Sequence, residues 1–356
     1  MTMAARGAES EFDRFLRLSK QIGTDILKTQ GAGGNTSLKD GDTMWVKASG
    51  TWLAQAGERD IMVPVRVAPL VEALRRGDPR AEKATDFVIT ALNTSGLRPS
   101  IETSFHAALP SPVVAHYHCV NTIALSVLKQ RDEIFRTKLE AAGMKWATVP
   151  YRRPGTPLAR DVDLAAESNP DVLILYNHGI IVTGETVEEV ADRIERVTAA
   201  LTLPARQVPD ADIGALQQLS QDSSYSPAAD LASHQLALVP ENIRLATGGS
   251  MYPDHVIFLG TTVGLLKAGQ SLPSYLERFA DKGQTAPKMI IVSGCGMLLS
   301  NELTPGGQVM ARCLAEVVAR IPEGADVVYL TEADEYELTN WEAEQYRQAL
   351  DRGART

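Results

Sequence analysis

The sequence predicts an α/β protein with a large first part and a smaller second part. From the N-terminus to about residue 205, stretches with apolar residues at helical spacing alternate with short apolar strands. Beyond residue 228, helical runs separate further short apolar runs. The stretch between these parts is polar and contains Pro209 and Pro227, which is typical of a linker. We therefore expect one unit over residues 1–206, a linker over 207–228 and a second α/β unit over 229–356.

The elements of the first part follow from local patterns. A helix is expected over residues 9–28, followed by a glycine-rich turn at 31–37 and a hairpin with strands near 35–38 and 44–47. Helices are also expected over 81–95, 102–109 and 121–129, and strands at 113–118, 171–176 and 180–182. Thr186 and Glu189 form a capping-box pattern that opens a last helix through about Leu201.

The second part predicts strands and helices in alternation. Apolar runs at 255–259, 289–292 and 327–330 have the length of strands. Helical runs lie at about 272–282, 305–321 and 340–351. This order predicts a second, smaller α/β layer.

Four of the six histidines fall in one pattern, which predicts a metal site. His116 and His118 point to the same side of the expected strand because side chains alternate faces. Two neighbouring imidazoles can chelate a divalent ion, and His178 can complete a three-histidine site with an open position for substrate. His106 is interpreted as structural or as a support for the ligands. The carboxylate of Glu102 lies shortly before the pair.

The composition excludes some other functions. With 44% hydrophobic and 22% charged residues, the chain resembles ordinary globular proteins. A net charge of −9 gives no support for binding to nucleic acid or to anionic membranes. The three cysteines show no CxxC spacing, and no apolar run approaches the length of a membrane span. We expect a cytoplasmic protein.

Five motifs in order resemble those of the class II aldolase/adducin family, which includes fuculose-phosphate and rhamnulose-phosphate aldolases and ribulose-phosphate 4-epimerase. The motifs are Gly33–Ser37, Lys47–Gly50, Pro99–Glu102, His116–His118 and Asn177–Gly179. The resemblance covers about residues 9–203, and the remainder resembles the region that follows this part in a long bacterial branch of the family.

The resemblance implies a three-layer fold with a central, mainly antiparallel sheet, helices on both sides, and assembly as a homotetramer. It assigns a divalent metal, usually zinc, to His116, His118 and His178, and the acid/base role to Glu102. It also implies that five residues line a pocket for a sugar or sugar-phosphate substrate: Gly34, Asn35, Ser49, Gly50 and Ser100.

These residue types suit carbon–carbon cleavage next to a ketone, which leaves an enediolate. A divalent cation can stabilise that charge, a nearby carboxylate can move the proton, and backbone N–H groups in a glycine-rich turn can bind an anion. The leading hypothesis is therefore a metal-dependent aldolase, a lyase of carbohydrate metabolism that cleaves a ketose or ketose phosphate.

Alternatives remain open within and outside this chemistry. Ile101 stands where many aldolases of the family have a second serine that donates to phosphate. Three options therefore stay open: the substrate is unphosphorylated, it carries a carboxylate instead of a phosphate, or its phosphate is bound by other donors such as Lys47. Epimerisation, decarboxylation and dehydration use the same metal and enolate chemistry. A non-catalytic scaffold like adducin is the alternative from a different class, although a scaffold has no need for three histidines and a glutamate.

Overall fold

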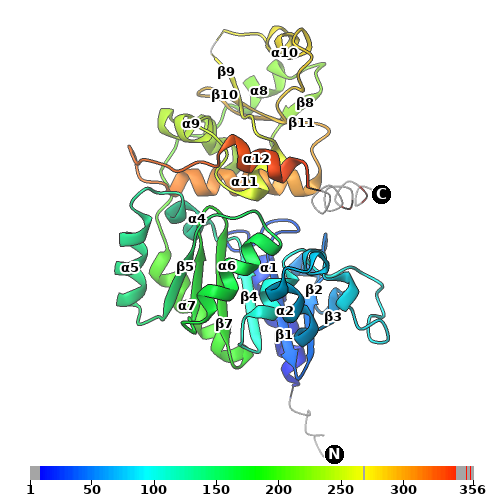
Figure 1. Ribbon diagram of the computed structural model, residues 1–356. Coiled ribbons are helices and arrows are strands. Elements are labelled where there is room, and N and C mark those ends of the chain that lie inside the picture. Colours follow the sequence, from blue (N-terminus) through cyan, green and yellow to red (C-terminus); the bar gives the residue numbers. More distant parts are fainter. Residues whose placement is uncertain (1–8, 268, 342–349, 351–352, 354–356) are drawn as a thin grey trace, which may run out of the picture.

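The first half of the chain is built around one seven-stranded sheet. The computed structural model describes residues 9–267, 269–341, 350 and 353 (Figure 1). The strand order is β3-β2-β1-β4-β7-β6-β5, and every pair is antiparallel except β5 with β6. The strands are β1 (Asn35–Asp40), β2 (Thr43–Lys47), β3 (Met62–Arg66), β4 (Val113–Tyr117), β5 (Trp146–Val149), β6 (Val172–Leu175) and β7 (Gly179–Gly184). The expected mainly antiparallel central sheet is confirmed.

Helices cover both faces of this sheet, which gives three layers. The helices are α1 (Glu11–Thr24), α2 (Val67–Arg76), α3 (Thr103–Ala108), α4 (Val120–Ser126), α5 (Arg131–Ala141), α6 (Thr156–Ala166) and α7 (Val187–Leu201). Buried residues of α1, α4, α5 and α7 share one cluster with Ala115 and Tyr117 of β4. Buried residues of α2, α3 and α6 share another with Val114, because successive side chains of a strand face opposite ways.

The second half contains a four-stranded sheet in the order β8-β11-β10-β9, with β9 parallel to β10. Its strands are β8 (Tyr225–Pro227), β9 (Gly264–Leu266), β10 (Met289–Val292) and β11 (Gly296–Ser300). Its helices are α8 (Ile213–Leu219), α9 (Pro240–Ala246), α10 (Leu272–Ala280), α11 (Pro305–Arg320) and α12 (Glu332–Thr339). The expected smaller second α/β layer is confirmed, and α11 and α12 lie between the two sheets (Figure 1).

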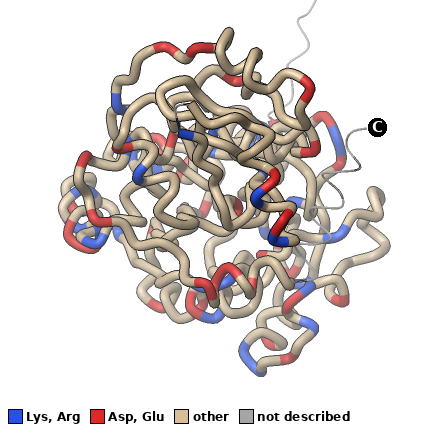
Figure 2. Tube along the Cα trace, turned by 90° about the horizontal axis from the view of Figure 1, so that it is seen from above, with Lys and Arg blue, Asp and Glu red and all other residues tan. Residues whose placement is uncertain are grey.

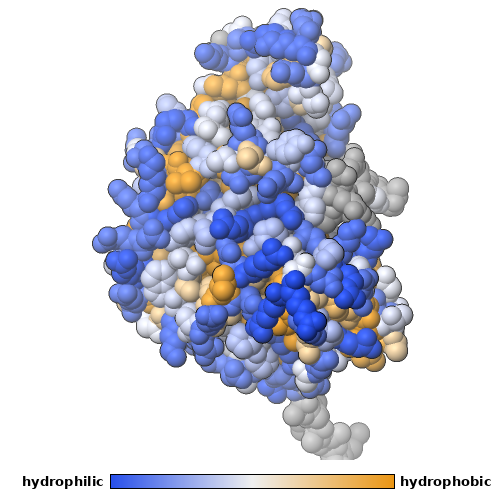
Figure 3. Space-filling model, in the orientation of Figure 1, coloured by the Kyte–Doolittle hydropathy of each residue, from blue (hydrophilic) through white to orange (hydrophobic). Residues whose placement is uncertain are grey.

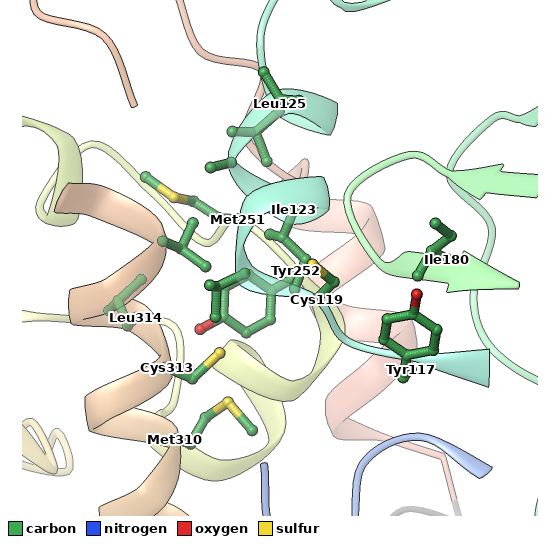
Figure 4. Packing of buried hydrophobic residues seen from close by; sticks show 14 of the residues in the cluster. Tyr117, Cys119, Ile123, Leu125, Ile180, Met251, Tyr252, Met310, Cys313 and Leu314 are labelled. Atoms are coloured by element: carbon green, nitrogen blue, oxygen red, sulfur yellow. The ribbon is translucent and has the colours of Figure 1, made fainter. Parts of the chain in front are cut away.

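One of the buried hydrophobic clusters joins the two halves. Ile123 and Leu125 of α4 belong to the same buried cluster as Tyr252, Cys313 and Leu314 of the second half. Figure 4 shows Tyr252 inserted between α4 and α11. The expected division of the chain after residue 206 stays a prediction, and the shared core runs across it.

Several expected elements differ from the structure for local reasons. The helix expected over 81–95 is replaced by two short 3-10 turns, Pro79–Glu82 and Thr85–Phe87. Ala84 between them has a positive φ of 53°, and Val88 forms a β-bridge with Val65 at the edge of the sheet. Backbone polar groups at the end of this stretch therefore form hydrogen bonds with β3 instead of with one another in a helix.

Two of the strands expected in the second half are also wrong. Residues His255–Leu259 form a π-helical turn, and the Gly260 N–H that follows it donates to Val256 O at 3.0 Å. Five consecutive buried residues show no periodicity, so helix and strand cannot be told apart from the sequence there. Residues 327–330 form only an isolated bridge, between Val327 and Leu128.

The polar stretch expected as a linker, 207–228, contains α8 and β8, and β8 is an edge strand of the second sheet. The helix expected over 340–351 falls mostly on residues outside the described ranges.

The face of the molecule seen in Figure 1 is mostly polar on its surface. Acidic and basic residues are intermixed around the periphery (Figure 2), and the face in Figure 3 is largely hydrophilic with separate apolar areas. Among the described residues, no helix has the length and apolarity needed to cross a membrane.

Candidate active site

Three neighbouring strands bring the predicted site residues together. His116 on β4 lies opposite Asn35 on β1 and opposite Ile181 on β7. His118 follows the last residue of β4, and His178 immediately precedes β7. Because β4 and β7 are hydrogen-bonded neighbours, two segments sixty residues apart in the chain meet at one end of the sheet.

The three histidines form a compact buried group that could hold a metal ion. Each pair of rings has its centroids 5.0 Å apart, and one nitrogen of each ring lies within 4.8 Å of the others. The exposed fractions of His116, His118 and His178 are 0%, 5% and 3%. Three imidazoles are a common ligand set for a catalytic divalent ion.

The hydrogen bond made by His116 determines which of its nitrogens faces the group. Its Nδ1 lies 3.0 Å from Ile180 O. A carbonyl oxygen only accepts, so Nδ1 carries the proton and Nε2 presents a lone pair. That lone pair points toward His118 Nε2, 3.2 Å away. The neutral imidazole is the metal-binding form.

Glu102 places a carboxylate beside the same nitrogens. Its Oε2 lies 3.4 Å from His116 Nε2, and its Oε1 lies 3.4 Å from His178 Nε2. Burial raises the pKa of Glu102, but the attraction of the imidazoles in their protonated forms at low pH and a hydrogen bond from Asn35 outweigh burial, and the pKa falls to about 2. A negative charge thus faces converging nitrogens, which is an environment that suits a cation.

The two imidazoles beside Glu102 remain neutral across the physiological range. Burial lowers the pKa of His116 to about 4 and that of His178 to about 3, against the opposing attraction of Glu102. Neutral imidazoles are ready to donate their lone pairs without first losing a proton.

A hydrogen-bond chain behind the site fixes the orientation of Asn35. His106 Nδ1 lies 2.8 Å from Ser37 Oγ, and its Nε2 is hydrogen-bonded to Asn35 Oδ1. Asn35 therefore turns its amide nitrogen to Glu102 Oε2, at 2.8 Å, and to Ser100 Oγ, at 3.0 Å. The buried His106 supports Asn35 and is not one of the clustered histidines.

The five expected substrate-binding residues line one pocket with Glu102, His118 and His178. Gly34 and Gly50 have φ angles of 64° and 75°, which L side chains adopt only with strain. Lys47 Nζ donates to Ala32 O at 2.9 Å and to Thr51 O at 2.6 Å, and so connects the two loops. The buried Lys47 side chain lies in the same pocket as the glycine-rich loops, whose backbone N–H groups can bind an anion.

No sequence motif points to the pocket residues that come from elsewhere in the chain. Pro154, Pro253 and Asp254 also line the pocket. Asp254 lies just before a run that predicts a strand, and no spacing links it to the histidines. An acidic residue next to a continuous apolar run is the only available hint, because such a carboxylate is often buried with a partner.

Gly179 packs so closely against the histidines that it provides a test of the site's geometry. A Cβ there would lie 2.7 Å from Tyr117 O, 3.2 Å from His118 Cδ2 and 3.4 Å from His116 Cε1. We expect Gly179→Ala to lower the free energy of unfolding by about 1–3 kcal/mol through overpacking, measured by urea denaturation.

Gly214 in α8 is the matched control, because the nearest atom to its added Cβ is 3.6 Å away. Gly214→Ala should leave stability unchanged or raise it by up to about 1 kcal/mol. Equal stability of Gly179→Ala and the wild type would contradict the close packing at the histidines.

The family whose description is "Class II Aldolase and Adducin N-terminal domain" matches residues 17–203. A Bacillus subtilis protein named "uncharacterized oxidoreductase YuxG" is 29% identical over 182 residues, covering 48% of this chain and 26% of that protein. This chain therefore spans about a quarter of that relative's length.

Two other relatives carry specific names. An L-fuculose phosphate aldolase of Methanococcus maripaludis is 27% identical over 166 residues, covering 46% of this chain and 80% of that protein. A 3-oxo-tetronate 4-phosphate decarboxylase of Escherichia coli is 35% identical over 115 residues, covering 29% of this chain and 53% of that protein.

A solved structure of the N-terminal class II aldolase domain of a conserved Thermoplasma acidophilum protein aligns with a TM-score of 0.47 at 27% identity. The aligned part makes up 56% of this chain and 98% of the chain of the solved structure. The family match alone spans more than half of the 356 residues, and the chain belongs to the class II aldolase and adducin N-terminal domain family.

Proposed function

We propose that the chain is a metal-dependent aldolase, a carbon–carbon lyase that cleaves a ketose or ketose phosphate. The observation that supports this most is the convergence of three buried imidazoles and one ionised carboxylate beside a pocket lined by glycines, Ser49 and Ser100. The family match and the L-fuculose phosphate aldolase among the relatives agree with this assignment.

His116, His118 and His178 are the residues we assign to the metal, with zinc as the leading ion. They suit it because His116 turns a lone pair inward and all three are shielded from water. A divalent ion bound there supplies a Lewis acid for the oxygen atoms of the substrate.

Glu102 is the residue we assign to proton transfer. Cleavage breaks the bond between the carbon beside the ketone and the hydroxyl-bearing carbon, which leaves as an aldehyde. The hydroxyl loses one proton and the carbon beside the ketone gains one. A carboxylate that is ionised at rest can accept a proton and return it to carbon. Asn35 holds its Oε2 in place at 2.8 Å.

Five residues are assigned to the anionic or hydroxyl end of the substrate: Gly34, Asn35, Ser49, Gly50 and Ser100. Backbone N–H groups at positive-φ glycines and the buried Lys47 favour a phosphate or a carboxylate there. Assembly as a homotetramer is part of the proposal and rests on the family resemblance.

Decarboxylation of a 3-oxo sugar-acid phosphate is the second candidate. A decarboxylase of this kind is 35% identical to this chain over 115 residues. The bond that breaks then releases carbon dioxide, and the carbon that carried the carboxylate takes up one proton, which Glu102 accepts from water and passes on. Lys47 and Ser100 would serve the phosphate of either substrate.

The two candidates differ in their products, so one experiment separates them. The zinc-loaded wild-type chain is incubated with ketose 1-phosphates, their unphosphorylated forms and 3-oxo sugar-acid phosphates. An aldehyde product from a ketose substrate is the expected result. Carbon dioxide from the acid alone would replace the aldolase by the decarboxylase. Turnover that persists after the metal is stripped, or no turnover of any substrate by zinc-loaded chain, would contradict both.

A further inference from the structure

The second half of the chain delivers one carboxylate to the histidine group. Asp254 Oδ2 lies 2.9 Å from Nδ1 of His118, and Asp254 is 2% exposed. Pro253 and Asp254 line the same pocket as Glu102 and His178. The contact joins positions 136 residues apart in the sequence, from the two halves of the chain.

The contact with Asp254 determines which ring nitrogen of His118 carries the proton. A carboxylate oxygen and a ring lone pair would repel each other at this distance, so in the neutral, metal-binding form of His118 the proton lies on Nδ1 and Nε2 carries the lone pair. His116 is fixed in the same way by Ile180 O. Two lone pairs, on Nε2 of His116 and of His118, therefore face each other at 3.2 Å. Such an arrangement is unfavourable alone and becomes favourable with a cation between the rings.

The chain segment that carries Asp254 is packed into the core. Tyr252, two residues before Asp254, is 1% exposed and packs in the shared core beside Cys313 (Figure 4). On the other side, Gly33 leaves the space that the contact needs. A Cβ at Gly33 would lie 2.8 Å from both Asp254 Oδ2 and His118 Nδ1.

We propose that Asp254 is a positioning residue that holds His118 in the Nδ1–H tautomer, and that the second half thereby completes the metal site. A carboxylate behind a metal-binding imidazole fixes the ring and raises its basicity. The inference rests on the metal-binding part of the proposed function and not on the reaction that follows.

Cobalt binding to the metal-free chain of 356 residues tests this directly. Loss of the carboxylate in Asp254→Ala should weaken the affinity for Co²⁺ about 10–100-fold and change the visible spectrum of the bound ion. Asp254→Asn keeps an oxygen that can accept from Nδ1, so it should recover most of the affinity. Glu316→Gln is the matched control, since Glu316 is a buried carboxylate of the same half that pairs with Arg312 and Arg320. It should bind Co²⁺ like the wild type.

A double-mutant cycle with His118→Ala shows whether Asp254 acts through His118. If it does, adding Asp254→Ala to His118→Ala produces no further loss of Co²⁺ affinity. The proposal would be overturned if Asp254→Ala reduced Co²⁺ affinity equally in the wild type and in His118→Ala. Wild-type Co²⁺ affinity in Asp254→Ala alone would also overturn it. A chain that binds Co²⁺ with these ratios but cleaves no substrate would contradict the proposed reaction and leave the role of Asp254 intact. A wild-type chain that takes up no metal would overturn both.

Discussion

His116→Ala is expected to reduce the metal content of the purified chain from about one ion to a small fraction of that, and to abolish turnover. His116 is the most enclosed of the three histidines, and its ring contacts both other rings and Phe105. Alanine leaves two imidazoles and removes the nitrogen closest to His118 Nε2. Elemental analysis of protein purified without chelator measures the metal directly, and substrate cleavage is assayed on the same sample.

His234→Ala is the control for loss of a buried histidine. His234 is fully buried in the second half, where Nδ1 accepts from Met297 N at 3.0 Å and Nε2 donates to Ala228 O at 3.0 Å. Its loss should lower stability and leave metal content at the wild-type level. Wild-type metal content in His116→Ala would remove His116 from the ligand set.

Glu102→Gln is expected to keep the metal and lose about 10²–10⁴-fold in kcat. Glutamine has the size of glutamate and retains an oxygen that can accept from Asn35, but it cannot carry a proton to carbon. Rates measured at saturating substrate, with metal content determined on the same preparation, separate proton transfer from metal binding.

Two comparisons make this result decisive. Glu316→Gln removes a buried carboxylate that does not line the pocket and should leave kcat unchanged. Asn35→Ala removes the donor to Glu102 Oε2 and should reduce kcat less than Glu102→Gln does. A near wild-type rate for Glu102→Gln would exclude Glu102 from proton transfer.

The sequence predicts well those features whose pattern is complete within a few residues. The strand that carries His116, the helix opened by Thr186 and the strand after His178 all occur where the local pattern places them. Thr186 Oγ1 accepts from Glu189 N at 3.2 Å as a capping residue should. Ordered motifs also indicate which residues belong to the pocket, because these motifs lie at the ends of strands in one sheet.

The features that the sequence does not predict depend on contacts between distant segments. Residues 255–259 are apolar throughout, so nothing in their spacing reveals a π-helical turn. Asp254 reaches His118 only because Tyr252 and its neighbours are buried against α4 and α11. No local pattern encodes that packing, so a pocket residue from the second half could not be recognised from sequence alone.

The contacts of Asn177 with the second half restrict how the two halves of such a chain could be exchanged during evolution. Its side chain donates to Met251 O at 2.9 Å and to Val328 O at 2.7 Å, while its neighbour His178 faces the pocket. A second half acquired from another lineage would have to match these carbonyl positions as well as the apolar surface of α4. Recombination at residue 206 would therefore seldom yield a working hybrid, and selection should keep the two halves together as one inherited block.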